Sequence, residues 1–131
     1  MTEAEMVKLA NLNELLGKTL ASVEVVDDKE LRFATTDGKR YRLSHEEVCC
    51  ETVRIESIVG DLADLVGEPL LMAEQSTGET PNDYRFKYEP ESYTWTFYKF
   101  ATRKGYVDVR WLGESNGEYG KEVEFVEFYE V

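Results

Sequence analysis

The spacing of apolar residues near the start of the chain predicts a helix. Over residues 4–16, one helical stripe carries Met6, Leu9, Leu12 and Leu16. Gly17 follows at a position where a left-handed residue commonly ends a helix. We therefore expect an N-terminal helix, with residues 1–11 as a less ordered or peripheral helical extension.

Beyond Gly17 the apolar period changes to two, which predicts strands. Asp37-Gly38 between two such segments is a hairpin signal, because both residues tolerate the positive φ angles of a tight turn. Residues 61–67 resemble a second short helix, capped by Asp61 and ended by Gly67. The predicted fold class is α+β: one compact domain over residues 1–131, a mostly antiparallel curved sheet with an N-terminal helix and a second short helix on one face. The alternating apolar pairs are Val23/Val25, Leu31/Phe33, Tyr41/Leu43 and Val53/Ile55.

Two further patterns leave alternatives open. Residues 12–20 and 62–70 share Leu, Leu, Gly and Leu at an offset of 50, which indicates either the common needs of a helix–glycine–strand junction or a duplicated unit. In the last segment the apolar parity slips between Phe125 and Val126, which indicates a bulge or a strand buried on both faces.

Composition excludes several classes of protein. The chain has 131 residues, 42% of them hydrophobic, and a formal net charge of -12. This mixture is typical of a single globular domain and not of a disordered chain. The longest apolar runs have about four residues, far below the 18 or more of a membrane span. The acidic segment at residues 1–5 differs from a secretory signal, so we expect a cytoplasmic protein that does not bind a membrane. Because binding to phosphates needs a local excess of lysine and arginine, we also expect no direct binding of nucleic acid.

The densest group of reactive side chains lies at residues 44–51. His45, Cys49 and Glu51 could bind a ligand or a metal, but a tetrahedral zinc site needs ligands from a second segment and no other Cys/His pair exists. A Cys–His nucleophile is disfavoured, because neighbouring acids raise the pKa of a thiol. Packing of the cysteines in the core is the simpler interpretation. We expect no cofactor and no catalytic activity.

Aromatic and acidic side chains suggest a partner surface. On a strand over residues 93–98, we expect Tyr93, Trp95 and Phe97 to face the core and Thr94, Thr96 and Tyr98 to be half-exposed. An acidic stretch after Gly113 suits a basic partner, although a solvated edge explains it as well. The candidate partner-binding residues are Tyr98, Tyr119, Glu114, Glu118, Glu122 and Glu124.

A set of short motifs is spread along most of the chain. They are Leu16-Gly17-Lys18, His45 with Cys49-Cys50-Glu51, Gly60-Asp61-Leu62, residues 67–74, residues 91–99, Gly105-Tyr106-Val107 and Arg110-Trp111 followed by Ser115-Asn116-Gly117. In these motifs the chain resembles a family of small uncharacterised proteins encoded by bacteriophages and prophages. The resemblance covers residues 12–126 and implies a domain of unknown function with no catalytic residues to carry over. Glu118 departs from the family pattern, in which an aromatic residue often precedes the position of Tyr119.

These observations predict a phage-type, non-catalytic interaction protein that binds and modulates a host protein in the bacterial cytoplasm. One alternative is a module that sequesters a nucleotide-like molecule, with Arg54, Arg85 or Arg110 meeting its phosphate. A second alternative is a metal- or thiol-dependent enzyme around His45 and Cys49. The sequence leaves the oligomeric state open, and a homo-oligomer is retained as an alternative.

Overall fold

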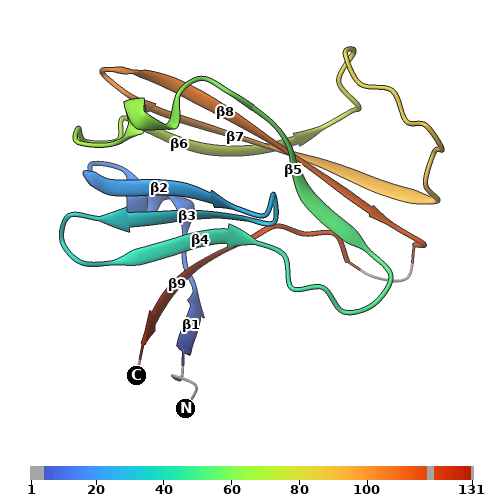
Figure 1. Cartoon of the computed structure of the whole chain (residues 1–131), viewed down its shortest axis with the longest axis horizontal. Helices are drawn as coiled ribbons and strands as arrows, with labels where there is room; N and C mark the ends of the chain where they lie inside the picture. The colour runs from blue at the N-terminus through green and yellow to red at the C-terminus, as the bar shows by residue number, and fades with distance from the viewer. Residues whose placement is uncertain (1–4, 118–119, 131) are drawn as a thin grey trace.

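Two antiparallel β-sheets face each other in this computed structural model, which describes residues 5–117 and 120–130 (Figure 1). The first sheet has the order β1-β9-β4-β3-β2 and the second the order β5-β8-β7-β6. The β1 and β9 strands extend away from the body of the two layers (Figure 1). The strands are β1 (Glu5–Leu9), β2 (Leu20–Val26), β3 (Glu30–Thr35), β4 (Arg40–Ser44), β5 (Thr52–Val59), β6 (Met72–Gly78), β7 (Ser92–Thr102), β8 (Gly105–Ser115) and β9 (Glu124–Glu130).

The predicted α+β class is wrong, because the only helical segments described are two single 3-10 turns, η1 (Leu12–Leu15) and η2 (Leu62–Leu65). The Asn11 side chain accepts a hydrogen bond from the Asn13 N–H, and Glu14 accepts one from the Asn11 N–H. This capping box starts η1 at residue 12 and ends any helix that would come from upstream. Residues 5–9 instead pair with β9, so the expected helical extension over residues 1–11 is replaced by a strand in its described part.

The second predicted helix is also only one 3-10 turn, although it lies at the expected place. Asp61 caps η2 by accepting a hydrogen bond from the Ala63 N–H, and Gly67 follows with a φ of +90°. The predicted hairpin at Asp37-Gly38 is present, with Gly38 at a φ of +93°. Turn chemistry was thus readable from the sequence, whereas the length of the helices was not.

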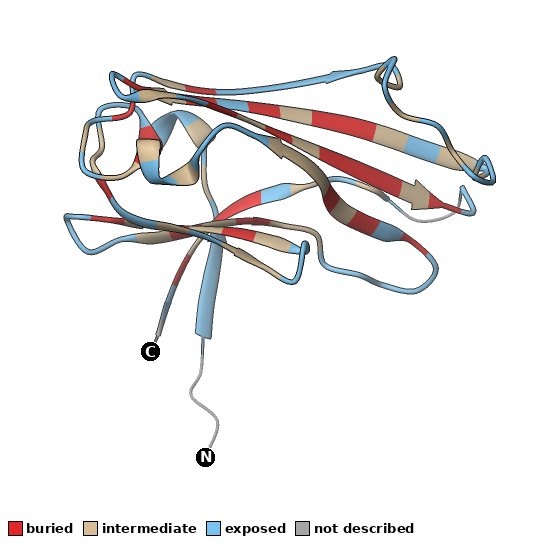
Figure 2. Cartoon of the chain, turned by 45° about the horizontal axis from the view of Figure 1, so that its top comes forward, coloured by how far each residue is buried: buried red, intermediate tan, exposed pale blue. Residues whose placement is uncertain are grey.

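Most of the buried segments belong to the strands of the two sheets (Figure 2), and their inward-facing side chains form the hydrophobic core. One aromatic contact links the two layers: the Phe33 ring lies 5.3 Å from that of Phe100 in the second sheet, between ring centroids. Within the first sheet, the Phe33 ring lies 6.3 Å from that of Phe125. Tyr41 stacks on Phe125 at 5.1 Å. Such contacts add to the large apolar area that each ring buries, so these side chains stabilise the first sheet and its packing against the second.

The β7 strand faces the core with the opposite side from the one predicted. Tyr98 and Phe100 belong to the core between the sheets, and Tyr98 is only 1% exposed. Trp95 is buried on the outer face instead, where Tyr84 and Phe86 pack against it. The sequence could not show this, because the residues that cover the outer face come from the irregular segment at 79–91.

The two segments related by the offset of 50 lie against each other. The Gly17 N–H donates to the Leu70 carbonyl at 2.9 Å, and the Gly67 N–H donates to the Leu20 carbonyl at 3.0 Å. At the offset of 50, Gly17 corresponds to Gly67 and Leu20 to Leu70. Each segment thus makes the same hydrogen bond to the other, as a local two-fold axis requires. The strand orders agree as well: β9-β4-β3-β2 matches β5-β8-β7-β6, with β9 in the place of β5. The reciprocal contacts favour the duplicated-unit interpretation.

Candidate functional site

Three arginines converge on one phenylalanine on the outer face of the first sheet. Along β3 and β4, Leu31, Phe33, Tyr41 and Leu43 point inward, so Arg32, Arg40 and Arg42 point outward. Their guanidinium carbons lie 5.6, 4.8 and 5.1 Å from the centre of the Phe128 ring. We call Arg32, Arg40, Arg42 and Phe128, with Val7 and Val126 beside them, the Phe128 face.

The charges of this face are only partly balanced. Arg32 pairs with Glu30, and Arg42 pairs with Glu5, each at 2.8 Å. Arg40 has no hydrogen bond or ion pair among the side chains that the structure describes, and the Nε atom of Arg42 is buried without an acceptor there. A buried donor without a partner costs free energy unless a ligand, an ion or water supplies the acceptor. Among the described side chains, the Arg40 guanidinium is therefore the donor group of this face that is left for an anionic group.

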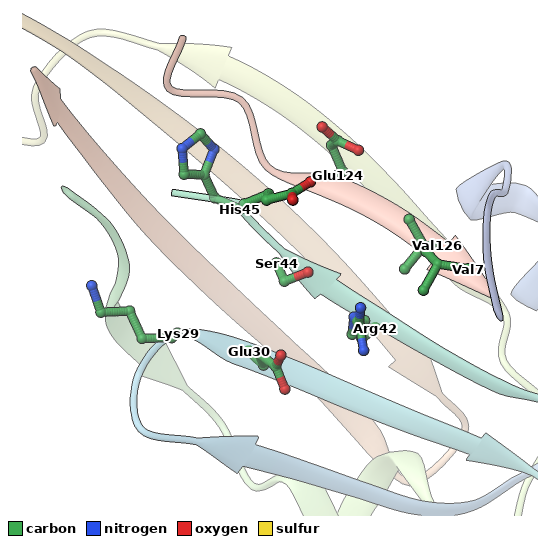
Figure 3. Close-up of a pocket in the computed structure, with 9 residues that line it drawn as sticks. Val7, Lys29, Glu30, Arg42, Ser44, His45, Glu124 and Val126 are labelled. Carbon is green, nitrogen blue, oxygen red and sulfur yellow. The ribbon is translucent and has the colours of Figure 1, made fainter. Parts of the chain in front are cut away.

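A groove of about 510 Å³ runs beside the Phe128 face. Figure 3 shows Arg42 and Ser44 along β4, with Glu30 from β3 on one side and Val126 from β9 on the other. Its size fits a small ligand or a few side chains of a peptide. The lining residues are Val7, Lys29, Glu30, Arg42, Ser44, His45, Glu46, Glu124 and Val126.

His45 joins one end of this groove to the loop that follows β4. Its Nδ1 atom lies 2.7 Å from the carbonyl oxygen of Glu122, so Nδ1 donates there. Its Nε2 atom lies 3.3 Å from Oε1 of Glu51, a carboxylate whose side chain is fully buried. Because a carboxylate only accepts, the Nε2 atom can donate to it only in the imidazolium form. His45 thus fastens the loop to the segment before β9.

Lowering the pH is expected to destabilise this loop through Glu51. The Val48 N–H, with smaller contributions from His45 and the Cys49 N–H, lowers the pKa of Glu51, although burial opposes the shift. A carboxyl with a lower pKa in the folded chain stabilises the fold above its unfolded pKa, and this stabilisation is lost as the pH falls through the folded value. We expect the free energy of unfolding, measured with urea, to fall more for the wild type than for Glu51→Gln when the pH is lowered from about 6 to about 3.

The matched control for this prediction is Glu46→Gln, which removes an exposed carboxylate from the same loop and should keep the wild-type pH dependence. Asp37 has a pKa of about 2, lowered by its hydrogen bond with Lys18, so it loses its charge below the pH range of this experiment. Parallel pH curves for the wild type and Glu51→Gln would contradict the prediction.

The structure brings together some of the predicted site residues and separates others. His45 and Glu124 line one groove, and Glu122 contributes its carbonyl oxygen to His45. Glu114 lies in the second sheet, opposite Thr52 and Tyr93. Tyr98 faces the core and is not accessible as an anchor. Glu118 and Tyr119 lie outside the described residues.

The cysteines lie outside the core, contrary to the prediction that they pack within it. Cys49 and Cys50 are exposed and are bonded to each other, so the Sγ atom of Cys49 is not a free thiolate. Cys49 contacts the predicted site through its backbone N–H, which donates to Oε2 of Glu51 at 3.4 Å. No group of three or more His, Cys, Asp or Glu that could hold a metal ion occurs in the described parts of the chain.

Two of the three arginines expected to meet a phosphate, Arg110 and Arg85, have partners within the described part of the chain. Arg54, the third, lies in β5 opposite Leu112. Arg110 pairs with Glu56 and with Asp83, the latter at 3.0 Å. Arg85 donates to the carbonyl oxygens of Asn82 and Tyr84, both at 3.1 Å. These contacts give both side chains structural partners.

Sequence reasoning missed the Phe128 face, although two signals for it were present. The alternation that places Tyr41 in the core also places Arg40 and Arg42 outside. The slip in parity at Phe125 and Val126 reflects a strand buried on both faces: Phe125 packs inward, Val126 and Phe128 are buried on the outer side, and β9 pairs with β4 without a bulge. The sequence left these two explanations open.

A family model described as a domain of unknown function (DUF7448) matches residues 13–125. No curated protein and no solved structure matches the chain significantly. In the described part of the chain, no helix is long and apolar enough to cross a membrane.

Proposed function

Because the chain belongs to the DUF7448 family, whose function is unknown, we propose its function from its geometry: it is a non-catalytic, phage-encoded interaction protein that binds a host protein through the Phe128 face. The phage origin and the bacterial cytoplasm as its location rest on the resemblance of its sequence motifs. The contact surface rests on the arrangement of side chains in the first sheet.

The observation that carries this proposal is the combination of arginines and apolar side chains on one exposed sheet face. On β1, Val7 of the Phe128 face is 46% exposed, and Leu9, on the same side of the strand, is 74% exposed. Met6 and Tyr129 are also exposed, but they form the neighbouring register pair and project from the other side of the β1–β9 ribbon. Protein interfaces are enriched in aromatic residues, methionine and arginine, and their strongest contacts are those that lose water completely. The Phe128 face supplies the arginines and an aromatic ring, and β1 adds the exposed aliphatic side chains of Val7 and Leu9.

The basic partner expected from the net charge stays a prediction. Charge of -12 would speed association with a basic protein at low salt. The candidate glutamates do not form one surface, since Glu114 lies in the second sheet while Glu122 and Glu124 lie near His45. The partner would therefore meet the charged side chains of the Phe128 face, and the net charge of the whole chain matters less at the contact itself.

Site-specific photo-crosslinking tests the proposal. A photoreactive phenylalanine derivative at Leu9, beside the Phe128 face, is expected to trap one defined protein in cells of the bacterial host. The same group at Leu71, which is exposed to a similar extent at 68%, is the matched control and should trap none. Val7→Asp should abolish the crosslink from Leu9, because a buried carboxylate would be placed in an apolar contact. Absence of a product from Leu9, or the same product from both positions, would refute this surface.

A further inference from the structure

The second sheet shows how this protein covers an outer face that carries an arginine over an aromatic ring. The guanidinium carbon of Arg110 lies 5.5 Å from the centre of the Trp95 ring. Residues 79–91 connect β6 to β7 and supply what covers this pair. Asp83 accepts a hydrogen bond from Nη1 of Arg110 at 3.0 Å, and the Tyr84 ring packs edge-on against Trp95 at 4.9 Å. The covering segment thus contributes a carboxylate and, at the next residue, an aromatic ring.

The first sheet has the same combination without a cover. Arg40 lies 4.8 Å from the centre of the Phe128 ring, closer than Arg110 lies to Trp95. The connection between β2 and β3, which corresponds in strand order to residues 79–91, contains only residues 27–29 and forms a tight turn. Within the part of the chain that the structure describes, no segment crosses the Phe128 face.

We propose that the Phe128 face binds an extended segment of the partner that carries a carboxylate next to an aromatic side chain. This inference rests on the proposed function and names the chemistry of its partner. The carboxylate pairs with Arg40, and the aromatic ring enters the groove against Val7 and Val126, where the Arg42 guanidinium borders it. Arginine suits both contacts, because its planar group pairs with carboxylates and stacks on rings.

The local charges favour a carboxylate even though the whole chain is acidic. Arg40 has no carboxylate partner among the described side chains, and Arg42 Nε has no acceptor. Distant charges are screened beyond about 8–10 Å at physiological salt, so contacts at hydrogen-bond distance decide the preference. Arg110 already illustrates the arrangement, since it holds one carboxylate from its own sheet, Glu56, and a second from the covering segment, Asp83.

The test uses the chain's own covering segment as the probe. A peptide with the sequence of residues 80–88 is added to the full-length protein, and backbone amide shifts are followed by NMR. We expect shifts at Val7, Arg40, Arg42 and Val126. Arg40→Glu is expected to weaken binding about tenfold, because it replaces an ion pair by like charges. Arg103→Glu, the same charge change at an exposed site in the β7–β8 turn, should change binding less than about twofold.

Changes in the peptide test the same contacts without altering the protein. Peptides with Asp83→Asn or with Tyr84→Ser and Phe86→Ser should each bind more weakly than the parent peptide. Shifts centred on Trp95 and Arg110 would show that the peptide only displaces its own counterpart from the second sheet, and would overturn the inference. Concentration-dependent shifts of the same face without peptide would assign it to a second copy of the chain, and would also overturn it.

The outcomes separate this inference from the proposed function. If crosslinking from Leu9 traps a partner but the parent peptide neither binds the Phe128 face nor competes with that partner, the function stands and the partner chemistry is wrong. If the peptide binds as expected but Leu9 traps no protein, the chemistry of the face is supported and its use in binding a host protein is refuted.

Discussion

Replacement of Phe33 by alanine is expected to lower the free energy of unfolding by about 3–5 kcal/mol. Phe33 is 1% exposed and its ring contacts Phe100 of the second sheet and Phe125 of the first. The substitution removes buried apolar area and leaves a cavity between the layers that neighbouring strands cannot close without shifting register. Urea denaturation followed by tryptophan fluorescence measures the loss. Both tryptophans are buried in the second sheet, so their fluorescence changes when that sheet unfolds.

The control for Phe33 is Tyr88→Ala, which removes an aromatic ring that is 81% exposed and should change stability by less than about 0.5 kcal/mol. Phe33→Leu should recover much of the loss, since it restores most of the apolar volume. Equal effects of Phe33→Ala and Tyr88→Ala would mean that the two sheets are not held together by this contact.

Gly60→Ala is expected to destabilise the fold by about 2–5 kcal/mol, from backbone strain and steric overlap combined. Gly60 follows β5 with a φ of +106°, a conformation that residues with a side chain rarely adopt. A Cβ atom there would lie 2.5 Å from the carbonyl oxygen of Tyr106 and 3.2 Å from the Cα atom of Val107. Both atoms belong to the backbone of β8, which pairs with β5, so neither can move without disturbing that pairing.

Gly67→Ala separates the two causes. Gly67 has a φ of +90°, but a Cβ atom there would meet nothing within 4 Å. Its substitution should therefore cost only the conformational strain, about 1–2 kcal/mol. Thermal or urea unfolding of both variants gives the difference, which reports the overlap with β8. If Gly60→Ala costs no more than Gly67→Ala, β5 and β8 do not approach as closely as described.

The strands of the first sheet could be predicted wherever their two faces differ in polarity. Leu31, Phe33, Tyr41 and Leu43 alternate with polar residues and are all buried. The N-terminal segment could not be assigned in this way, because Met6 and Leu9 lie at a helical spacing but are exposed in the strand. Its conformation depends on pairing with β9, more than a hundred residues away. The capping box at Asn11 was the local signal that no helix runs through this segment.

The candidate site shows the same limit. His45 and Glu51 are close in sequence, and their proximity in the fold was accessible to local reasoning. The Phe128 face was not, since it needs β9 to lie between β1 and β4 and to bury side chains on both of its faces. Local alternation gives the orientation of Arg40 and Arg42 but cannot identify the ring beneath them.

The position of β9 has a consequence for how the chain matures on the ribosome. The second sheet contains strands joined in sequence, and its longest pair, β7 and β8, forms from a short hairpin. The first sheet remains split, with β1 separate from β4, until β9 has been synthesised and inserted between them. Pairings over such sequence separations form late, because loop closure must precede them. The Phe128 face, which is built on a side chain of β9, therefore forms only after β9 has joined the first sheet.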